Sequence, residues 1–233
     1  MNEKLKELYI DRFELLTPEL EEYNSTVDSE KKATNPFLIR VPSNYERYQN
    51  KIMIFGQETN SWGKECGNNA VFSNNIEKSL DIYEKFYLNG GINSYRGPFW
   101  SEFKRIKKEI EKLGNSVFVW NNINKIGITG KGNLGAINEI QFNRFQVVND
   151  EIELLKPNII VFLTGPNYDF FIEKNIGSFK QTKISDSLYS LEFKSKYSNI
   201  KFFKTYHPNG LYHLKKNKIV IPNLIKEIKQ ICR

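Results

Sequence analysis

The stretch Lys51–Gly63, KIMIFGQETNSWG, decides how the rest of this chain is interpreted. Lys51–Phe55 is apolar enough for a buried strand, and Gly56 permits the sharp backbone turn that ends it. The residues after the turn, Gln57–Asn60, are polar and follow the carboxyl end of the strand. Ligands bind beyond that end of the strands in open α/β sheets. The stretch therefore predicts one wall of a binding pocket.

Two later stretches repeat this pattern of an apolar strand that runs into polar residues. They are Val117–Lys125, VFVWNNINK, and Phe202–Leu211, FFKTYHPNGL, which contains a strand over Lys201–Thr205. Ile159–Leu163 is apolar throughout, which is typical of a central parallel strand covered on both faces. Three predicted strand ends thus offer a carboxylate, a pair of amides and an imidazole to one pocket.

Apolar residues at helical spacing predict a helix over Glu3–Leu16, and Pro18 is expected to open a second, short one. Alternating residues predict a hairpin over Thr182–Phe193. Further helices are expected over Asn75–Leu88, Phe99–Leu113, Ile137–Leu155, near Tyr168–Glu173 and over Pro222–Cys232. Strands that alternate with helices predict an α/β fold, here a three-layer α/β/α arrangement around a mainly parallel sheet.

The length of 233 residues is enough to bury a full core, and the simplest organisation is one domain over residues 1–233. Residues 1 to about 45 form an N-terminal helical extension in this interpretation. Hydrophobic residues make up 39% and charged residues 26%, which is typical of a soluble globular protein. No apolar run approaches the roughly 20 residues of a membrane span, and the acidic N-terminus does not resemble a signal peptide.

Two cysteines, Cys66 and Cys232, provide neither a disulfide framework nor a four-ligand metal site. This usage favours a reducing cytoplasm and a chain without a cofactor. The net charge of +7 favours a polyanionic partner. We expect a monomer that does not associate with membranes.

Four stretches resemble motifs of the uracil-DNA glycosylase superfamily. GQET at Gly56–Thr59 resembles the water-activating motif Gly-Gln-Asp-Pro-Tyr, and HPNGL at His207–Leu211 resembles His-Pro-Ser-Pro-Leu. VWNNINK at Val119–Lys125 is similar to the strand that ends in the base-reading asparagine. KPNIIVFLTG at Lys156–Gly165 is similar to the strand between these motifs. The four occur in the family's order with similar separations, over roughly residues 51–214.

The resemblance implies a uracil-DNA glycosylase-like fold and gives roles to individual residues. Glu58 would stabilise an oxocarbenium-like sugar and activate water, and His207 would hydrogen-bond the departing base. Asn122 would read the pyrimidine edge because it keeps the family's distance to Lys125, with Asn121 as the alternative. Three further residues are expected to line the base pocket, and they are Gln57, Asn60 and Phe72, the last as the stacking aromatic.

The same resemblance assigns residues to the DNA itself. Leu211 falls on the leucine that fills the gap left by a flipped base. Asn209 lies in the same motif. Lys215, Lys216 and Lys218 follow that motif, and their position there makes them candidates for phosphate contacts. No lysine of the matched motifs stands where a Schiff-base nucleophile is needed, so we expect a monofunctional enzyme.

Two residues depart from the best-known branch of the family. Glu58 replaces its aspartate and carries the carboxylate one methylene farther from the backbone. Asn60 replaces the tyrosine that blocks C5 substituents, so the sequence leaves open whether the base is uracil or a C5-modified pyrimidine. The first case suits DNA repair and the second suits defence against phage DNA. The iron–sulfur branch needs four cysteines, and this chain has two.

Structural roles are the alternatives at each position. Glu58 can be a turn carboxylate, His207 a structural histidine and Asn121 and Asn122 helix or turn caps. Phe72 and Leu211 can be core residues. The alternative function is a catalytically inactive relative that binds DNA or a partner protein.

Overall fold

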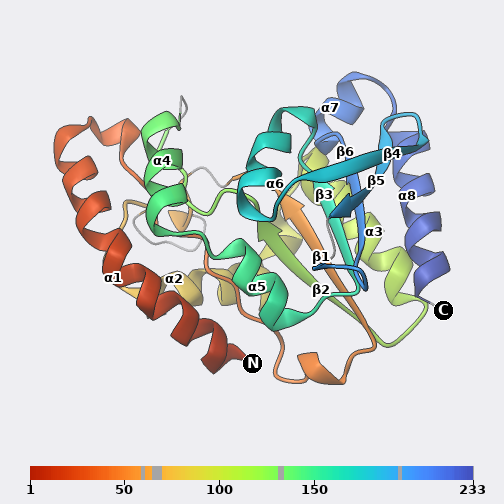
Figure 1. The fold of residues 1–233 in the computed structure, drawn as a ribbon, viewed down its shortest axis with the longest axis horizontal. Helices are drawn as coiled ribbons and strands as arrows, with labels where there is room; N and C mark the ends of the chain where they lie inside the picture. Colours follow the sequence, from red (N-terminus) through yellow and green to blue (C-terminus); the bar gives the residue numbers. More distant parts are fainter. Residues whose placement is uncertain (59–60, 65–69, 131–133, 194–195, 233) are drawn as a thin grey trace. The chain divides into compact units, whose positions relative to one another are not determined.

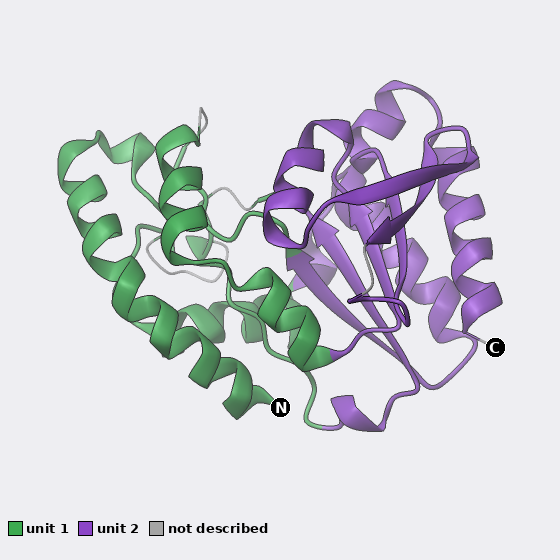
Figure 2. Cartoon of the chain, viewed as in Figure 1, with its two compact units in different colours: residues 1–43, 57–91, 122–155 green, residues 44–56, 92–121, 156–233 purple. Residues whose placement is uncertain are grey.

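The computed structural model describes residues 1–58, 61–64, 70–130, 134–193 and 196–232. The chain divides into two compact units, which Figure 2 colours separately. Unit 1 comprises residues 1–43, 57–91 and 122–155, and unit 2 comprises residues 44–56, 92–121 and 156–233. Asn60 lies outside the described residues, as do Cys66 and Lys131.

Unit 2 is built around a six-stranded sheet (Figure 1) with the order β2-β1-β3-β6-β5-β4. The strands are β1 (Asn50–Gly56), β2 (Ser116–Asn122), β3 (Ile159–Leu163), β4 (Phe179–Ser185), β5 (Leu188–Phe193) and β6 (Lys201–Thr205). β3 is buried along its whole length, as expected for a strand in the middle of a sheet.

The middle of the sheet is parallel. Ile52 of β1 pairs with Ile159 of β3, and Leu163 of β3 pairs with Thr205 of β6. Backbone bonds from Asn50 to Asn115 and from Asn124 to Gln57 advance in the same direction along β1 and β2, which makes this pair parallel as well. β5 runs antiparallel to both β6 and β4, so the predicted hairpin is confirmed.

The helices of unit 2 are α3 (Pro98–Glu111), α6 (Asp169–Asn175), α7 (Pro208–His213) and α8 (Asn217–Ile231). α3 packs against both α7 and α8. Short helical turns occur at η2 (Tyr45–Arg47), η5 (Gly91–Ser94) and η6 (Pro166–Tyr168). The predicted start of the last helix at Pro222 is wrong, because the buried stripe already begins at Val220 and the helix continues through the proline. Tertiary packing of that stripe outweighs the lost backbone bond.

Unit 1 contains α1 (Asn2–Thr26), α2 (Ile76–Tyr83) with the following η4 (Glu84–Leu88), α4 (Gly135–Arg144), α5 (Val148–Leu155) and the short η1 (Ser29–Lys31). Two helices were expected where α1 is continuous. Leu16 and Leu20 are both fully buried on either side of Pro18, so the buried stripe continues across the proline. This packing holds the helix together through Pro18.

The long helix expected over Ile137–Leu155 is two helices. Phe145 has φ −137° and ψ 47°, which lie outside the helical range, so α4 ends there. Its ring packs edge-on against Phe13 of α1, with 5.9 Å between the ring centroids. Val147 is also fully buried, so the side chains of Phe145 and Val147 point inward between α4 and α5, whereas Gln146 is exposed. No glycine or proline marks this break in the sequence, which is why periodicity alone joins the two helices.

The α/β class with a mixed, mostly parallel sheet is therefore confirmed, and the arrangement is compatible with three layers. No helix within the described ranges is both long and apolar enough to span a membrane.

Candidate active site

The turn after β1 is tied to the segment after β2 within unit 1. The Asn124 N–H donates to the Gln57 carbonyl at 3.0 Å, and the Ser61 N–H donates to the Ile128 carbonyl at 3.1 Å. The Ser61 hydroxyl adds a bond to the Thr129 carbonyl. Glu58 is half-buried between these anchors. Its carboxylate is thus carried by a turn whose backbone is held on both sides.

Aromatic rings pack around Trp62, which lies at the end of this turn. Trp62 is 1% exposed and packs against Phe37 at 5.0 Å and against Phe86 at 5.6 Å between ring centroids. The ring is therefore a core residue of unit 1. Its burial anchors the turn that carries Glu58.

The segment after β2 is held by a buried ionic network. Lys125 and Glu151 have fully buried side chains, and the Lys125 Nζ lies 2.8 Å and 2.7 Å from the two Glu151 carboxylate oxygens. The Tyr9 hydroxyl donates to Glu151 at 2.6 Å, and the Gln141 Oε1 accepts the Lys125 N–H. Desolvation lowers the pKa of Lys125 and raises the pKa of Tyr9. Lys125, expected close to the pocket, is instead an internal support of unit 1.

The three asparagines at the end of β2 have different surroundings. Asn121 is fully buried and its amide donates to the Met53 sulfur of β1 at 3.6 Å, which makes it a core residue. Asn122 is 2% exposed and points to the opposite face of the strand. Asn124 is 1% exposed, and its Oδ1 has no hydrogen-bond partner among the residues that the structure describes.

An unpaired buried amide oxygen costs about 1–3 kcal/mol, so the side chain of Asn124 requires an explanation. The backbone N–H of Asn124 binds the carbonyl of Gln57, and Gln57 belongs to the turn that carries Glu58. The sequence drew attention to Asn121 and Asn122 because of the family motif, and nothing in its spacing singled out Asn124.

Phe72 is 9% exposed, and its ring lies 6.1 Å from Phe13 of α1. Its N–H also donates to the Ala33 carbonyl. These contacts favour the packing role over the role of stacking aromatic.

His207 stands at the other predicted strand end, in unit 2. It is the N-cap residue of α7, and its Nδ1 accepts the Asn209 N–H at 3.3 Å. The neutral imidazole therefore carries its proton on Nε2. The Phe99 ring lies nearly parallel to the imidazole, with 5.6 Å between centroids and 13° between planes. Burial lowers the pKa of His207 below its ordinary value, which favours the neutral form.

The end of β3 lies against the backbone of His207. Gly165 has a φ of 82°, and its N–H donates to the Thr205 carbonyl at 3.0 Å. A Cβ at Gly165 would lie 3.6 Å from the His207 nitrogen. Lys204, the residue before Thr205 in β6, is 3% exposed and binds both carboxylate oxygens of Asp169 at 2.6 Å. Glycine and an ion pair thus support the strand end that presents His207.

The residues predicted to contact DNA separate into two groups. Leu211 is fully buried, which favours its core role over the wedge role. Asn209 and Lys215 are exposed, and Lys216 is half-buried in an ion pair with Asp186 at 2.9 Å. Exposed apolar side chains nevertheless occur in the same segment, at Tyr212, Leu214 and Ile219.

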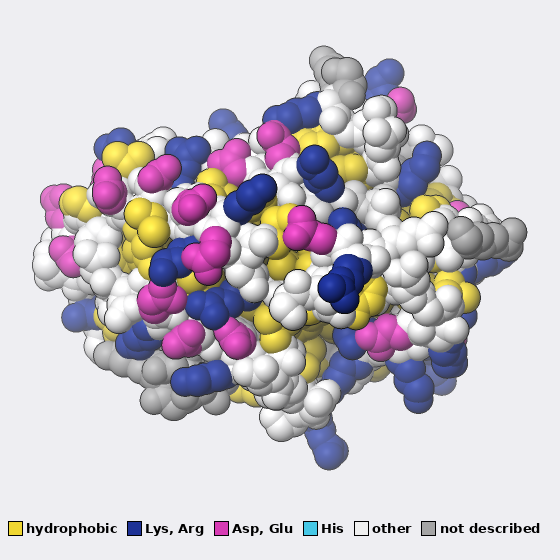
Figure 3. Space-filling model, turned by 90° about the horizontal axis from the view of Figure 1, so that it is seen from below, with side chains coloured by type: hydrophobic (Ala, Val, Ile, Leu, Met, Phe, Trp, Pro, Cys, Tyr) yellow, Lys and Arg dark blue, Asp and Glu magenta, His cyan; other side chains and the backbone are white. Residues whose placement is uncertain are grey.

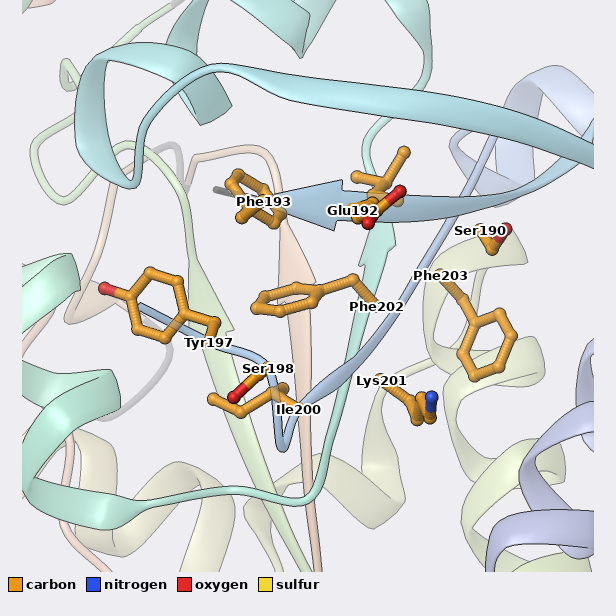
Figure 4. A pocket seen from close by; sticks show the side chains of 10 residues that line it. Ser190, Glu192, Phe193, Tyr197, Ser198, Ile200, Lys201, Phe202 and Phe203 are labelled. Atoms are coloured by element: carbon orange, nitrogen blue, oxygen red, sulfur yellow. The ribbon is translucent and has the colours of Figure 1, made fainter. Parts of the chain in front are cut away.

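A separate pocket of about 470 Å³ occurs elsewhere in unit 2 (Figure 4). Phe193 and Phe202 line it and pack on each other at 4.5 Å, and Lys201 lies at the amino end of β6. His207 follows the opposite end of that strand, and no predicted site residue lines this pocket. It is therefore distinct from the predicted site.

Within the described ranges, no group of three or more histidine, cysteine, aspartate or glutamate side chains is arranged to hold a metal ion. Comparison with protein-family models and with curated proteins finds no match to this chain.

Proposed function

We propose that this chain is a monofunctional DNA glycosylase that hydrolyses the bond between a pyrimidine base and deoxyribose. The observation that supports this most directly is the position of three motifs relative to the sheet. β1, β2 and β6 end at Gly56, Asn122 and Thr205. The motifs that contain Glu58, Asn122 and His207 lie at these three strand ends. In open α/β sheets, ligands usually bind beyond the carboxyl ends of the parallel strands.

The chemistry requires one acidic and one hydrogen-bonding group. In the proposed reaction, water attacks C1′ of the sugar, the bond from C1′ to the base nitrogen breaks, and Glu58 accepts a proton from the water. The carboxylate also stabilises the positive charge that develops on the sugar. The base leaves as an anion, and the His207 Nε2–H donates a hydrogen bond to its oxygen.

The state of His207 supports this role. A neutral imidazole whose Nδ1 already accepts a hydrogen bond has its Nε2–H available for a ligand. Burial favours that neutral state near physiological pH. The substrate is uracil or a pyrimidine with a C5 substituent, and the role is repair or defence against foreign DNA accordingly.

The test is release of free base by the full chain. Oligonucleotides with uracil, thymine or 5-hydroxymethyluracil, together with phage DNA that carries modified bases, are incubated with the protein, and released bases are quantified by mass spectrometry. Glu58→Ala, Glu58→Gln and His207→Ala are each expected to reduce release by at least about tenfold, because each removes a group that acts in the transition state.

His213→Ala is the matched control, since His213 is exposed in the same helix as the His207 cap. Near-full activity in a folded Glu58→Gln or His207→Ala protein contradicts the mechanism. DNA binding without release of any base supports the inactive relative instead. Excision of uracil, without release of any base that carries a C5 substituent, contradicts the expectation that the site accepts C5-modified pyrimidines.

A further inference from the structure

Phe99 is an aromatic side chain of unit 2 that the sequence analysis did not assign to the site. It is the second residue of α3, directly after Pro98, and its ring is half-buried. One ring contact is with Phe103, at 6.1 Å and 26°, and another is with Trp100, at 4.9 Å and 87°. The third contact is the nearly parallel stack on His207. The first turn of a helix thus fixes an aromatic face next to the imidazole.

The imidazole covers only part of that face. Two parallel rings in van der Waals contact lie about 3.5 Å apart, and the centroids of Phe99 and His207 are 5.6 Å apart. The rings are therefore displaced sideways by roughly 4 Å, which leaves part of the Phe99 face beyond the imidazole. A second planar ring that stacks on Phe99 would lie on this uncovered part of its face.

A hydrogen bond that His207 donated to such a ring would determine the orientation of the ring. The His207 Nδ1 is occupied by the Asn209 N–H, so a ligand is reached through Nε2–H, which points outward in the imidazole plane. A carbonyl oxygen accepts best when the hydrogen lies close to the plane of the carbonyl group. A carbonyl-bearing heterocycle bound to Nε2 is therefore favoured in the plane of the imidazole, parallel to the Phe99 ring.

We propose that Phe99 is the stacking platform for the pyrimidine base that His207 binds. The inference rests on the proposed function and identifies the aromatic partner of the base in that site. Phe72, the aromatic expected from the sequence, packs instead against Phe13 in unit 1. An anionic pyrimidine is stabilised at its oxygen by His207 and at its face by Phe99.

Three variants separate stacking from simple packing. Phe99→Leu keeps an apolar side chain of similar size but removes the aromatic face, and Phe99→Tyr keeps that face. Phe170→Leu is the control, because Phe170 is an aromatic of unit 2 that is 54% exposed in α6. Stacking of a base on an aromatic residue has a large effect on binding, so Phe99→Leu is expected to lower kcat/KM for base release about tenfold. Phe99→Tyr and Phe170→Leu are expected to stay within about twofold of the wild type.

A second measurement reports the stack directly. Free uracil is titrated with wild-type and variant proteins, and the proton resonances of its C5–H and C6–H are followed by NMR. Stacking on an aromatic face shifts these resonances upfield. The wild type and Phe99→Tyr are expected to show the shift, and Phe99→Leu is expected to lose it.

The outcomes distinguish this inference from the proposed function. If the Glu58 and His207 variants lose activity but Phe99→Leu keeps full activity, the role of Phe99 as a stacking platform is wrong and the proposed function stands. Reduced activity in Phe99→Leu with an unchanged upfield shift also overturns it, because Phe99 then acts only by positioning His207. Unchanged base release in the Glu58 and His207 variants overturns the proposed function itself.

Discussion

His207 shows how a residue's chemistry depends on neighbours that are distant in sequence. Its motif supplies the N-cap position and the Asn209 N–H that occupies Nδ1. The stacked Phe99 ring comes from the start of α3, more than a hundred residues earlier. Burial lowers the pKa of the ring and so favours its neutral form, and these contacts orient the ring to donate through Nε2.

We predict that His207 titrates below its ordinary pKa of 6.5, because burial penalises the imidazolium. Its proton resonances can be followed by NMR over pH, and His213 is the only other histidine in the chain. The His207 midpoint should lie below 6.5 and should rise towards 6.5 in Phe99→Ala, which opens the site to water. A His213→Gln protein assigns the signals. A midpoint at or above 6.5 in the wild type contradicts a neutral donor.

Glu58 and His207 could be predicted from the sequence because each stands in a short motif at a strand end. Phe99 and Asn124 could not. Phe99 is adjacent to His207 only through the packing of α3 in unit 2, and Asn124 is distinguished only by the missing partner of a buried amide. Leu211 was assigned a DNA contact because of its position in a motif, but that position does not reveal that its side chain is fully buried.

Helix ends were the least predictable features at the scale of elements. Pro18 and Pro222 both lie inside helices because buried stripes continue across them. Phe145 interrupts the helical stretch 135–155 although no glycine or proline is present. The strands were predicted more closely, because short apolar runs between turn residues define them without knowledge of their partners.

The segment after β2 depends on a network that joins three elements. Lys125 follows β2, Glu151 lies in α5 and Tyr9 lies in α1. Such a pair is costly to disrupt from one side, because the remaining charge stays buried without a counter-ion.

We therefore predict that Lys125→Met lowers the free energy of unfolding by about 3–5 kcal/mol. The double variant Lys125→Met/Glu151→Gln should recover much of this loss, since a neutral amide oxygen can still accept the Tyr9 hydroxyl. Urea unfolding followed by circular dichroism measures both. Lys107→Met, which breaks an exposed pair with Glu111, is the control and should change stability by no more than about 1 kcal/mol. Equal stability of Lys125→Met and wild type contradicts the role of the network.

The charges of the whole molecule are divided unevenly between its two units. Unit 2 contains 22 lysines and arginines but only 9 aspartates and glutamates, whereas unit 1 contains 12 and 18. Figure 3 shows one face, on which acidic side chains gather in one part and basic ones dominate another. The net charge of +7 thus hides a strongly basic unit and an acidic one, and such asymmetry is typical of nucleic-acid binding by the basic part.

Within unit 2, the segment over residues 214–219 combines exposed apolar and basic side chains. Leu214 is 49% exposed and Ile219 is 60% exposed, with exposed Lys215 and Lys218 beside them. This segment directly follows the helix that His207 caps. Phosphate contacts next to a base-binding histidine position a duplex without reading its sequence.

We predict that Lys215→Ala/Lys218→Ala weakens the binding of duplex DNA and makes it less dependent on salt. Each lost phosphate contact reduces the slope of log K against log salt by roughly 0.9, so the double variant should lower it by about 1–2. Fluorescence anisotropy at several salt concentrations measures this in a Glu58→Gln background, where excision does not interfere. Lys4→Ala/Lys31→Ala removes two exposed lysines of acidic unit 1 and should leave the slope unchanged. Equal losses in the two double variants would show that general charge, and not this segment of unit 2, controls DNA binding.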